Sequence, residues 1–274
     1  MIAIITVNYN NAKITNKMLA NIAELNRNDI KVVVVDNNSE DRDELDKTEF
    51  STNLYLDSNI GYFPALNKGL KNIDLDLFEY VIICNNDLIF ENNFFSILRQ
   101  KKYVDSVYSV SPRIFDMDGI DQNPVFDRSP SKFKLFFYSL YYKNYYFGQI
   151  LYNLWQLRKP KPVLQSNDSH PIFQGYGAIY ILTKNFFKKN KSLDTPPFLM
   201  EEEAFLGAQI YKTDGILYYD SELIVHHQEH SSCKKIPSKV LYNYSKQSFQ
   251  FSKKLMCGQK IVSDEMHFAK YEIE

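Results

Sequence analysis

The stretch that decides the fold of this chain is Glu79-Tyr80-Val81-Ile82-Ile83-Cys84-Asn85-Asn86-Asp87. Residues 80–84 form a short apolar run, which is typical of a central strand in a mostly parallel sheet. Asn85, Asn86 and Asp87 follow it directly. Because ligands of open α/β sheets bind beyond the carboxyl ends of the strands, we expect these side chains in a binding crevice. The alternative is an Asx-type turn, in which they bond their own backbone.

Three earlier apolar segments end in the same way. They are residues 2–7, 32–35 and 54–56, followed by Asn8-Tyr9-Asn10-Asn11, Asp36-Asn37-Asn38-Ser39 and Asp57-Ser58-Asn59. Ile14, Met18, Ile22 and Leu25 predict a helix with one apolar stripe, capped by the polar residues 8–11. A second helix is expected to begin at Pro64. This alternation predicts βαβ units whose polar strand ends meet at one edge of a parallel sheet.

The composition excludes several classes of protein. With 274 residues, 45% of them hydrophobic, the chain can bury one large core. Its 32 basic and 33 acidic residues give a net charge of −1, so we expect no nucleic-acid partner. Three scattered cysteines predict a reducing, cytoplasmic setting. No apolar stretch reaches the ~18–20 residues of a membrane-spanning helix, and residues 2–7 predict a first strand, not a signal peptide.

A phosphate group would need a holder other than a glycine cradle. The first strand is not followed by Gly-x-Gly-x-x-Gly, and Gly-x-x-x-x-Gly-Lys does not occur in the chain. A divalent cation is the expected substitute.

A succession of motifs resembles family 2 glycosyltransferases, which have the GT-A fold. The motifs are Thr6-Val7-Asn8-Tyr9-Asn10, Val35-Asp36-Asn37-Asn38-Ser39, Asn59-Ile60-Gly61-Tyr62 with Asn67-Lys68-Gly69, Asn85-Asn86-Asp87, Gly175-Tyr176-Gly177-Ala178, Phe198-Leu199-Met200-Glu201-Glu202-Glu203, and Val225-His226-His227 with Ser231-Ser232. The subgroup that the chain resembles most includes rhamnosyltransferases of bacterial surface polysaccharide synthesis.

The resemblance implies an α/β, GT-A fold, Rossmann-like, with a mostly parallel central sheet and C-terminal helices. It implies a catalytic domain over residues 1–232, divided into a nucleotide-binding half (1–120), an aromatic-rich insert (124–170) and an acceptor and catalytic half (171–232). Residues 233–274 are expected to form a helical tail.

The resemblance also assigns roles at the strand ends. Tyr9 is expected to stack on the base of a nucleotide sugar and Asp36 to bond the base edge. The alternatives are surface packing for Tyr9 and a helix or turn cap for Asp36. The full set of expected nucleotide-binding residues is Val7, Asn8, Tyr9, Asp36, Asn59, Gly61, Asn67, Asn85 and Asn86.

Asp87 matches the last acid of the family's Asp-x-Asp signature, which holds Mn²⁺ or Mg²⁺ against the diphosphate. Asn85 stands where the first acid would be, so the site is less negative than the strict form. A histidine of the segment 223–232 completes the metal site: His227 if the family's serine is Ser232, His226 if it is Ser231. The alternative is a loop of solvated imidazoles.

Two acids and two glycines complete the expected site. Glu203 matches the family's catalytic base, and because it replaces an Asp, Glu202 stays open for that role. The alternative is a first helical turn that favours acids through the helix dipole. Gly175, Gly177 and Ala178 are expected to let the chain approach the sugar closely, with a bulge or tight turn as the alternative.

The aromatic segment 133–157, flanked by Lys132, Arg158, Lys159 and Lys161, suits an element that lies on a membrane. A flap over the acceptor site and a homodimer contact are the alternatives.

The sequence therefore predicts an inverting, metal-dependent glycosyltransferase at the inner face of the cell membrane. It would move a hexose or deoxyhexose, rhamnose included, from a UDP or dTDP sugar to a saccharide acceptor that is lipid-linked. One rival is a sugar-phosphate nucleotidyltransferase, which would need a glycine-rich loop with a basic residue where residues 8–12 have neither. The other is a non-catalytic partner of another transferase.

Overall fold

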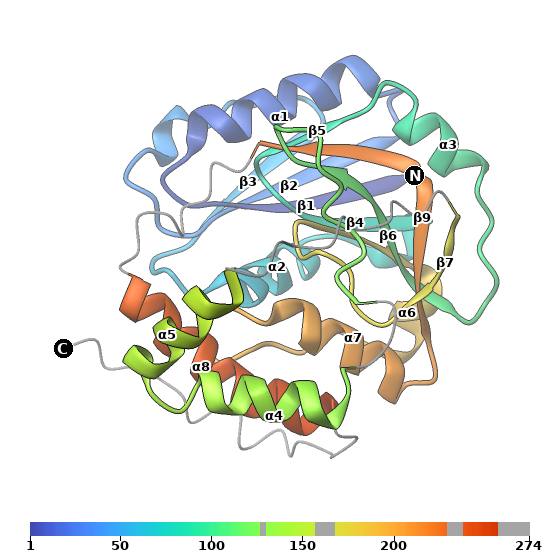
Figure 1. The fold of residues 1–274 in the computed structure, drawn as a ribbon. Coiled ribbons are helices and arrows are strands. Elements are labelled where there is room, and N and C mark those ends of the chain that lie inside the picture. The colour runs from blue at the N-terminus through green and yellow to red at the C-terminus, as the bar shows by residue number, and fades with distance from the viewer. Residues whose placement is uncertain (127–129, 157–167, 229–237, 257–274) are drawn as a thin grey trace.

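The computed structural model describes residues 1–126, 130–156, 168–228 and 238–256 (Figure 1). The strands are β1 Ile2–Asn8, β2 Ile30–Asp36, β3 Ser51–Tyr55, β4 Tyr80–Asn85, β5 Leu88–Phe90, β6 Val107–Phe115, β7 His170–Ile172, β8 Ile179–Thr183 and β9 Ile216–His227. The helices are α1 Ala12–Leu25, α2 Tyr62–Leu70, α3 Phe94–Gln100, α4 Lys132–Tyr141, α5 Tyr145–Gln156, α6 Lys184–Lys189, α7 Glu202–Lys212 and α8 Ser238–Met256. Two short 3-10 helices, η1 Arg42–Glu44 and η2 Leu75–Leu77, lie between them.

All described strands belong to one sheet, in the order β3-β2-β1-β4-β8-β6-β9-β5, with β7 paired to β9. The strands β1 to β4 are parallel to one another, as the βαβ pattern predicts. Beyond β4 the sheet is mixed: β8 is antiparallel to β4 and β6, whereas β6 and β9 are parallel. The expectation of a mostly parallel sheet is therefore confirmed only for the N-terminal half.

Helices cover both faces of this sheet. Side chains of α1 and α3, such as Met18 and Phe94, pack with Ile4 in one buried cluster. Side chains of α2 and α7, such as Phe63 and Leu206, pack with Ile5 in another. Neighbouring residues of β1 thus enter opposite clusters, as the two-residue period of a strand requires. This burial on both faces explains why β1 and β4 are apolar without alternation.

The predicted cap of α1 is wrong. Asn11 occupies the N-cap position but makes no side-chain cap bond. Asp41 substitutes for it, because its carboxylate accepts the Ala12 N–H at 2.8 Å. The predicted apolar stripe is confirmed at Met18 and Ile22, which are buried.

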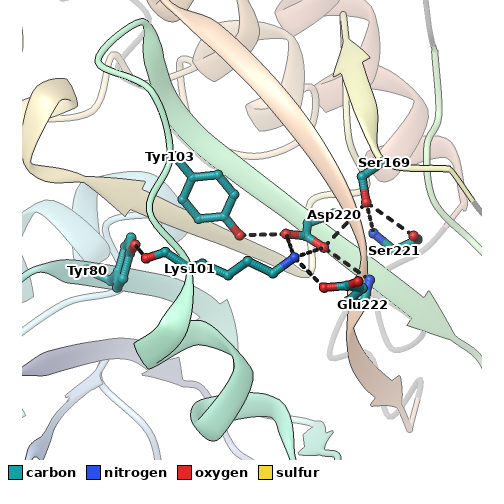
Figure 2. A network of polar contacts seen from close by, with 7 residues as sticks. All are labelled: Tyr80, Lys101, Tyr103, Ser169, Asp220, Ser221 and Glu222. Carbon is teal, nitrogen blue, oxygen red and sulfur yellow. Dashed lines mark hydrogen bonds and ion pairs between the residues drawn. The ribbon is translucent and has the colours of Figure 1, made fainter.

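The long strand β9 contains a bulge. Its pairing with β6 jumps from Pro112↔Asp220 to Arg113↔Ile224, so residues 221–223 lie outside the register. Asp220 fixes this bulge, because its carboxylate accepts the Tyr103 hydroxyl at 2.7 Å and contacts Lys101 Nζ at 3.1 Å (Figure 2). Beyond the bulge β9 pairs with β5, which sets His227 opposite Leu88.

The helices α4, α5 and α8 form a lobe beyond one end of the sheet (Figure 1). Aromatic rings hold it together: Tyr242 and Phe249 of α8 contact Tyr142, and the Tyr242 hydroxyl donates to the Tyr141 carbonyl at 2.9 Å. The expected insert and the expected C-terminal tail thus pack on each other. Among the described helices, none combines the length and the apolar character needed to cross a bilayer.

Candidate active site

Asp87 and His227 face each other across the end of the sheet. Asp87 follows β4, and His227 is the last residue of β9; the register of β5 with β9 brings them together. Asp87 Oδ1 lies 3.2 Å from His227 Nε2, and both side chains are about 5% exposed. Neither of these two buried atoms has a hydrogen-bond partner. The predicted proximity of Asp87 and His227 is confirmed.

Gln122 orients the imidazole of His227. The distance from His227 Nδ1 to Gln122 Oε1 is 3.1 Å, and an amide oxygen only accepts, so Nδ1 carries the proton. In the neutral ring, Nε2 then presents a lone pair toward the carboxylate. Sequence reasoning missed Gln122, because it lies in the irregular segment after β6 where no periodic pattern marks it.

The structure separates the two histidines that the sequence left open. Because successive residues of a strand point to opposite faces, His226 points away from Asp87. It instead contacts Glu91 at 2.7 Å and stacks on Phe115. His227 is therefore the candidate metal ligand and His226 is not. The two serines considered with them, Ser231 and Ser232, lie outside the described residues.

The pair of Asp87 and His227 fits a divalent cation. A lone pair and a carboxylate oxygen at 3.2 Å, both buried and without a donor, are the kind of atoms that a shared cation satisfies. The described residues contain no group of three or more His, Cys, Asp or Glu side chains suited to a metal. Mn²⁺ and Mg²⁺ commonly complete their coordination with phosphate oxygens and water.

Glu203 lies in the first turn of α7 beside Gly177. A backbone hydrogen bond from Gly177 reaches its carboxylate. A Cβ on Gly177 would come within 2.4 Å of Glu203 Oε1, so glycine is what leaves room for this carboxylate. Tyr176, in the same loop, reaches the pair of Asp87 and His227, because its ring centroid lies 5.7 Å from that of His227. The candidate base and the candidate ligand are therefore joined by residues 176–177.

Tyr62, the first residue of α2, is influenced by the charges of this region. Burial raises the pKa of its hydroxyl, and the neighbouring Cys84, Glu202, Asp87 and Glu203 raise it further through their charges. One phenol therefore lies within electrostatic range of both Asp87 and Glu203. The geometric link between the two acids is the loop at 176–177, where the Tyr176 ring contacts His227 and Gly177 lies against Glu203.

Three consecutive acids enter α7 with raised pKa values. Burial is the main cause for each, and it raises the pKa of Glu201 to about 7 and that of Glu202 to about 8. The charge of Glu203 adds to both shifts. Burial also raises the pKa of Glu203 itself, against the hydrogen bond from Gly177 that lowers it. These acids are more basic than exposed carboxylates, which suits proton acceptance.

A polar network joins the residues at the ends of β1, β2 and β4. Asn8 Nδ2 donates to Asp36 Oδ2 at 2.8 Å, and the Ser39 N–H donates to Asp36 Oδ1 at 2.9 Å. Asn86 Nδ2 reaches Thr15 at 2.8 Å, and the Thr15 hydroxyl donates to Asn8 Oδ1. Asp36 is fully buried and both of its oxygens are used within the protein. Asp36 therefore supports the end of β1 through Asn8, and its expected contact with a base edge stays a prediction.

Other expected nucleotide-binding residues divide into two groups. Tyr9, which follows β1, is 37% exposed. Asn59 is also exposed, and its Oδ1 accepts the Gly61 N–H at 3.0 Å. Asn67, in contrast, exchanges two 2.9 Å hydrogen bonds with the backbone of Leu193, so its amide anchors α2, and its expected nucleotide contact stays a prediction.

Val7, Asn85 and Gly61 hold structural positions near the tips. Val7 pairs with Asn85 across β1 and β4, and the Asn85 N–H donates to the Ala178 carbonyl at 2.8 Å. Gly61 has a φ of 90°, and a Cβ there would meet the Phe198 carbonyl oxygen at 2.3 Å. This glycine lets α2 approach the segment that leads to Glu203.

The motif at residues 175–178 acts through packing. Gly175 lies against Ser111, whose Oγ a Cβ would meet at 2.2 Å, and Ala178 is buried. The expected sugar contact of Gly175 and Ala178 stays a prediction, whereas Gly177 lies directly against Glu203. Asn123, which sequence reasoning missed, holds the loop by accepting the Tyr176 N–H at 3.0 Å.

Comparisons with known proteins agree with this architecture. The family description "Glycosyl transferase family 2" matches residues 3–156. A search of curated proteins with this sequence finds no match. Among solved structures, S. aureus TarS 1-349 is similar, with a TM-score of 0.56 and 12% identity over 97% of this chain and 68% of that one.

Two further structures share the fold. GalNAc-T7, crystallised with UDP, GalNAc and Mn²⁺, has a TM-score of 0.59 and 15% identity over 85% of this chain and 44% of its own length. The mannosyltransferase PcManGT from Pyrobaculum calidifontis, in complex with GDP-Man and Mn²⁺, has a TM-score of 0.53 and 15% identity over 84% of this chain and 57% of its own length. This chain thus spans about half the length of these two proteins.

Proposed function

Because this chain belongs to glycosyl transferase family 2, we propose that it is an inverting, metal-dependent glycosyltransferase that uses a nucleoside diphosphate sugar as donor. One observation carries the proposal: Asp87 Oδ1 and His227 Nε2 meet at 3.2 Å, buried and without hydrogen-bond partners. The loop at 176–177 joins this pair to Glu203. Such a transfer needs ligands for a cation and a base for the acceptor, and these residues would supply both.

Asp87 and His227 would hold Mn²⁺ or Mg²⁺. A cation bound there supplies positive charge to the leaving diphosphate, an effect of several kcal/mol in metal enzymes. GalNAc-T7 and PcManGT were crystallised with Mn²⁺, which supports this choice. Gln122 would keep His227 in the tautomer with a free Nε2 lone pair.

Glu203 would take the proton from the acceptor hydroxyl. The acceptor oxygen then bonds to the anomeric carbon while the bond from that carbon to the diphosphate oxygen breaks. The nucleoside diphosphate leaves with the electron pair, and a single displacement of this kind inverts the anomeric centre. Burial raises the pKa of Glu203, so its carboxylate holds the proton more tightly than an exposed one.

Tyr9, exposed at the first tip, would stack on the base of the donor. For the donor we propose a UDP or dTDP sugar with a hexose or deoxyhexose, including rhamnose. For the acceptor we propose a lipid-linked saccharide of bacterial surface polysaccharide synthesis. Within residues 1–232, segments 1–120 and 171–232 would bind donor and acceptor respectively.

The test is a thermal-shift screen with UDP, dTDP and GDP sugars, each with and without Mn²⁺. We expect one nucleotide class to raise the melting temperature, with a larger shift when Mn²⁺ is present. Asp87→Ala and His227→Ala should each remove the increment due to Mn²⁺.

His226→Ala is the matched control, because this neighbouring imidazole points away from Asp87 and pairs with Glu91. It should keep the Mn²⁺ increment. If His226→Ala loses the increment and His227→Ala keeps it, the assignment of the ligand is wrong. If no sugar nucleotide stabilises the chain under any condition, the result favours a non-catalytic partner of another transferase.

A further inference from the structure

The outer faces of α4 and α5 expose an unusual amount of apolar surface. Eight of the eighteen large hydrophobic side chains that the described residues expose lie on these two helices. Phe133, Phe136 and Phe137, at helical spacing, are 72%, 56% and 46% exposed. On α5, Tyr146, Ile150 and Leu154 follow one another at intervals of four residues, so they share a face.

Folding of the lobe does not require this surface. The inner faces of the helices already pack through other rings, such as Tyr142 and Tyr145 against Tyr242. Leu135, between the exposed phenylalanines, is the buried anchor of α4. Exposed apolar patches of this kind mark contacts with proteins or membranes.

The charge of the lobe selects between those partners. Residues 130–156 and 238–256 contain seven lysines and no Asp or Glu, whereas the whole chain has a net charge of −1. A symmetric pair of lobes would bring these like charges together, which opposes self-association through this face. Apolar rings beside lysines match a bilayer whose headgroups are anionic.

A hollow with lysines in its wall lies where the C-terminal end of α4 meets α8. It measures about 180 Å³ and is lined by Ser139, Tyr142, Lys246, Phe249, Gln250 and Lys253. Lys253 Nζ donates to Ser139 Oγ at 2.8 Å, so one ammonium group is held at the wall. Two lysines and a hydroxyl suit the phosphate of a lipid headgroup.

The lobe is attached directly to the candidate active site. Ser252 Oγ of α8 donates to Glu201 Oε2 at 3.2 Å, and Ser248 Oγ donates to the Leu199 carbonyl at 3.0 Å. Both partners belong to the segment that leads into α7 and Glu203. A surface that holds the lobe therefore lies close to the place where the acceptor must react.

We propose that α4, α5 and α8 dock this enzyme on the surface of an anionic phospholipid bilayer, with the rings of α4 and α5 at headgroup depth. The docking itself does not depend on the enzymatic activity. That it brings a lipid-linked acceptor to Glu203 rests on the function proposed above.

The test is sedimentation of the full chain with vesicles of equal parts phosphatidylglycerol and phosphatidylcholine, compared with vesicles of phosphatidylcholine alone. We expect binding to the anionic vesicles that weakens as salt is added. Trp155, the one tryptophan of the chain, belongs to α5, so a change of its emission on addition of vesicles gives a second readout of binding.

Two variants should lower the partition coefficient by ~10-fold or more. They are the triple variant Phe133→Ser, Phe136→Ser, Phe137→Ser and the double variant Lys132→Glu, Lys143→Glu. The matched controls change exposed residues elsewhere and should bind like the parent: Leu77→Ser, Val104→Ser, Ile120→Ser, and Lys13→Glu, Lys17→Glu.

Equal partitioning of lobe variants and controls would overturn the proposal, as would absence of binding to the anionic vesicles. A dimer in lipid-free buffer that the phenylalanine variant converts to a monomer would show instead that a second copy covers this face. The thermal shift with sugar nucleotides is measured on the same variants. A variant that keeps this thermal shift but no longer binds vesicles has lost docking alone. The two proposals can therefore fail separately.

Discussion

Glu203 and Glu202 are neighbours with different surroundings, and single substitutions can separate their roles. Glu203 accepts a hydrogen bond from the backbone of Gly177, whereas Glu202 accepts the Met200 N–H at 3.0 Å. For Glu203→Gln we expect kcat to fall at least ~10²-fold with donor affinity retained, because the amide cannot accept the proton. Steady-state kinetics with donor titrations measure both quantities.

The pH dependence of kcat supplies the control. Only the ionised form of Glu203 can act as base, and burial raises its pKa, so kcat should rise with pH through a midpoint above the ordinary Glu value of about 4.3. Glu202→Gln should keep most of this activity. A large loss in Glu202→Gln with activity retained in Glu203→Gln would assign the base to Glu202.

The raised pKa of Glu202 also leads to a prediction about stability. Burial and the charge of Glu203 raise its pKa from 4.5 to about 8. Between these values the folded chain keeps a proton that the unfolded chain has lost, so the free energy of unfolding falls as pH rises through this window. Glu202→Gln removes the titration and should raise stability at pH 7 by an amount on the order of 2 kcal/mol.

Urea denaturation at several pH values between 5 and 8 measures this effect. The variant should lose less stability than the parent as pH rises, with the two most alike at the acid end. Glu24→Gln, on the exposed face of α1, removes a similar charge without burial and is the matched control. Parallel pH profiles for the parent and Glu202→Gln would mean that Glu202 is ionised in the folded chain.

At the scale of elements, the first half of the fold was readable from the sequence. Residues 2–8 and 80–85 are apolar runs that end in polar residues, and both are buried strands of the parallel half. Helical spacing likewise marked α1, and Pro64 marked α2, although this helix begins two residues earlier, at Tyr62. These elements are regular, and local patterns determine them.

The second half depends on pairings between distant segments. The strand β5 has three residues, too few for any periodic pattern, yet its register with β9 decides that His227 and not His226 faces Asp87. The bulge at 221–223 that makes this register possible is held by Asp220 and Lys101. No local pattern encodes that contact, which joins residues more than a hundred positions apart.

The burial of Asp36 was hidden for a different reason. Six of the seven residues of β2 are buried, so the strand shows no alternation from which the direction of its last side chain could be read. The resemblance placed Asp36 near the nucleotide, but only the bonds from Asn8 and Ser39 show that it supports the tip. A strand buried on both faces conceals which of its polar ends point outward.

At the scale of the whole molecule, the core crosses the boundary between the two halves of the sheet. One buried cluster contains both Ile4 of β1 and Val225 of β9, and the other contains both Ile5 and Leu217. The lobe joins this core through the bonds of Ser248 and Ser252 to the segment before α7. Shared packing of this kind favours one cooperative unit.

We therefore expect a single unfolding transition in urea. Far-UV circular dichroism reports mainly the sheet and its helices, whereas fluorescence of Trp155 reports the lobe, because this residue belongs to α5. The two midpoints should coincide, and a stabilising sugar nucleotide with Mn²⁺ should move both by the same amount, since the ligand binds only the folded state. A fluorescence midpoint at lower urea, unmoved by the nucleotide, would show that the lobe unfolds independently, and the contacts of α8 with residues 199–201 would then be too weak to couple the lobe to the active site.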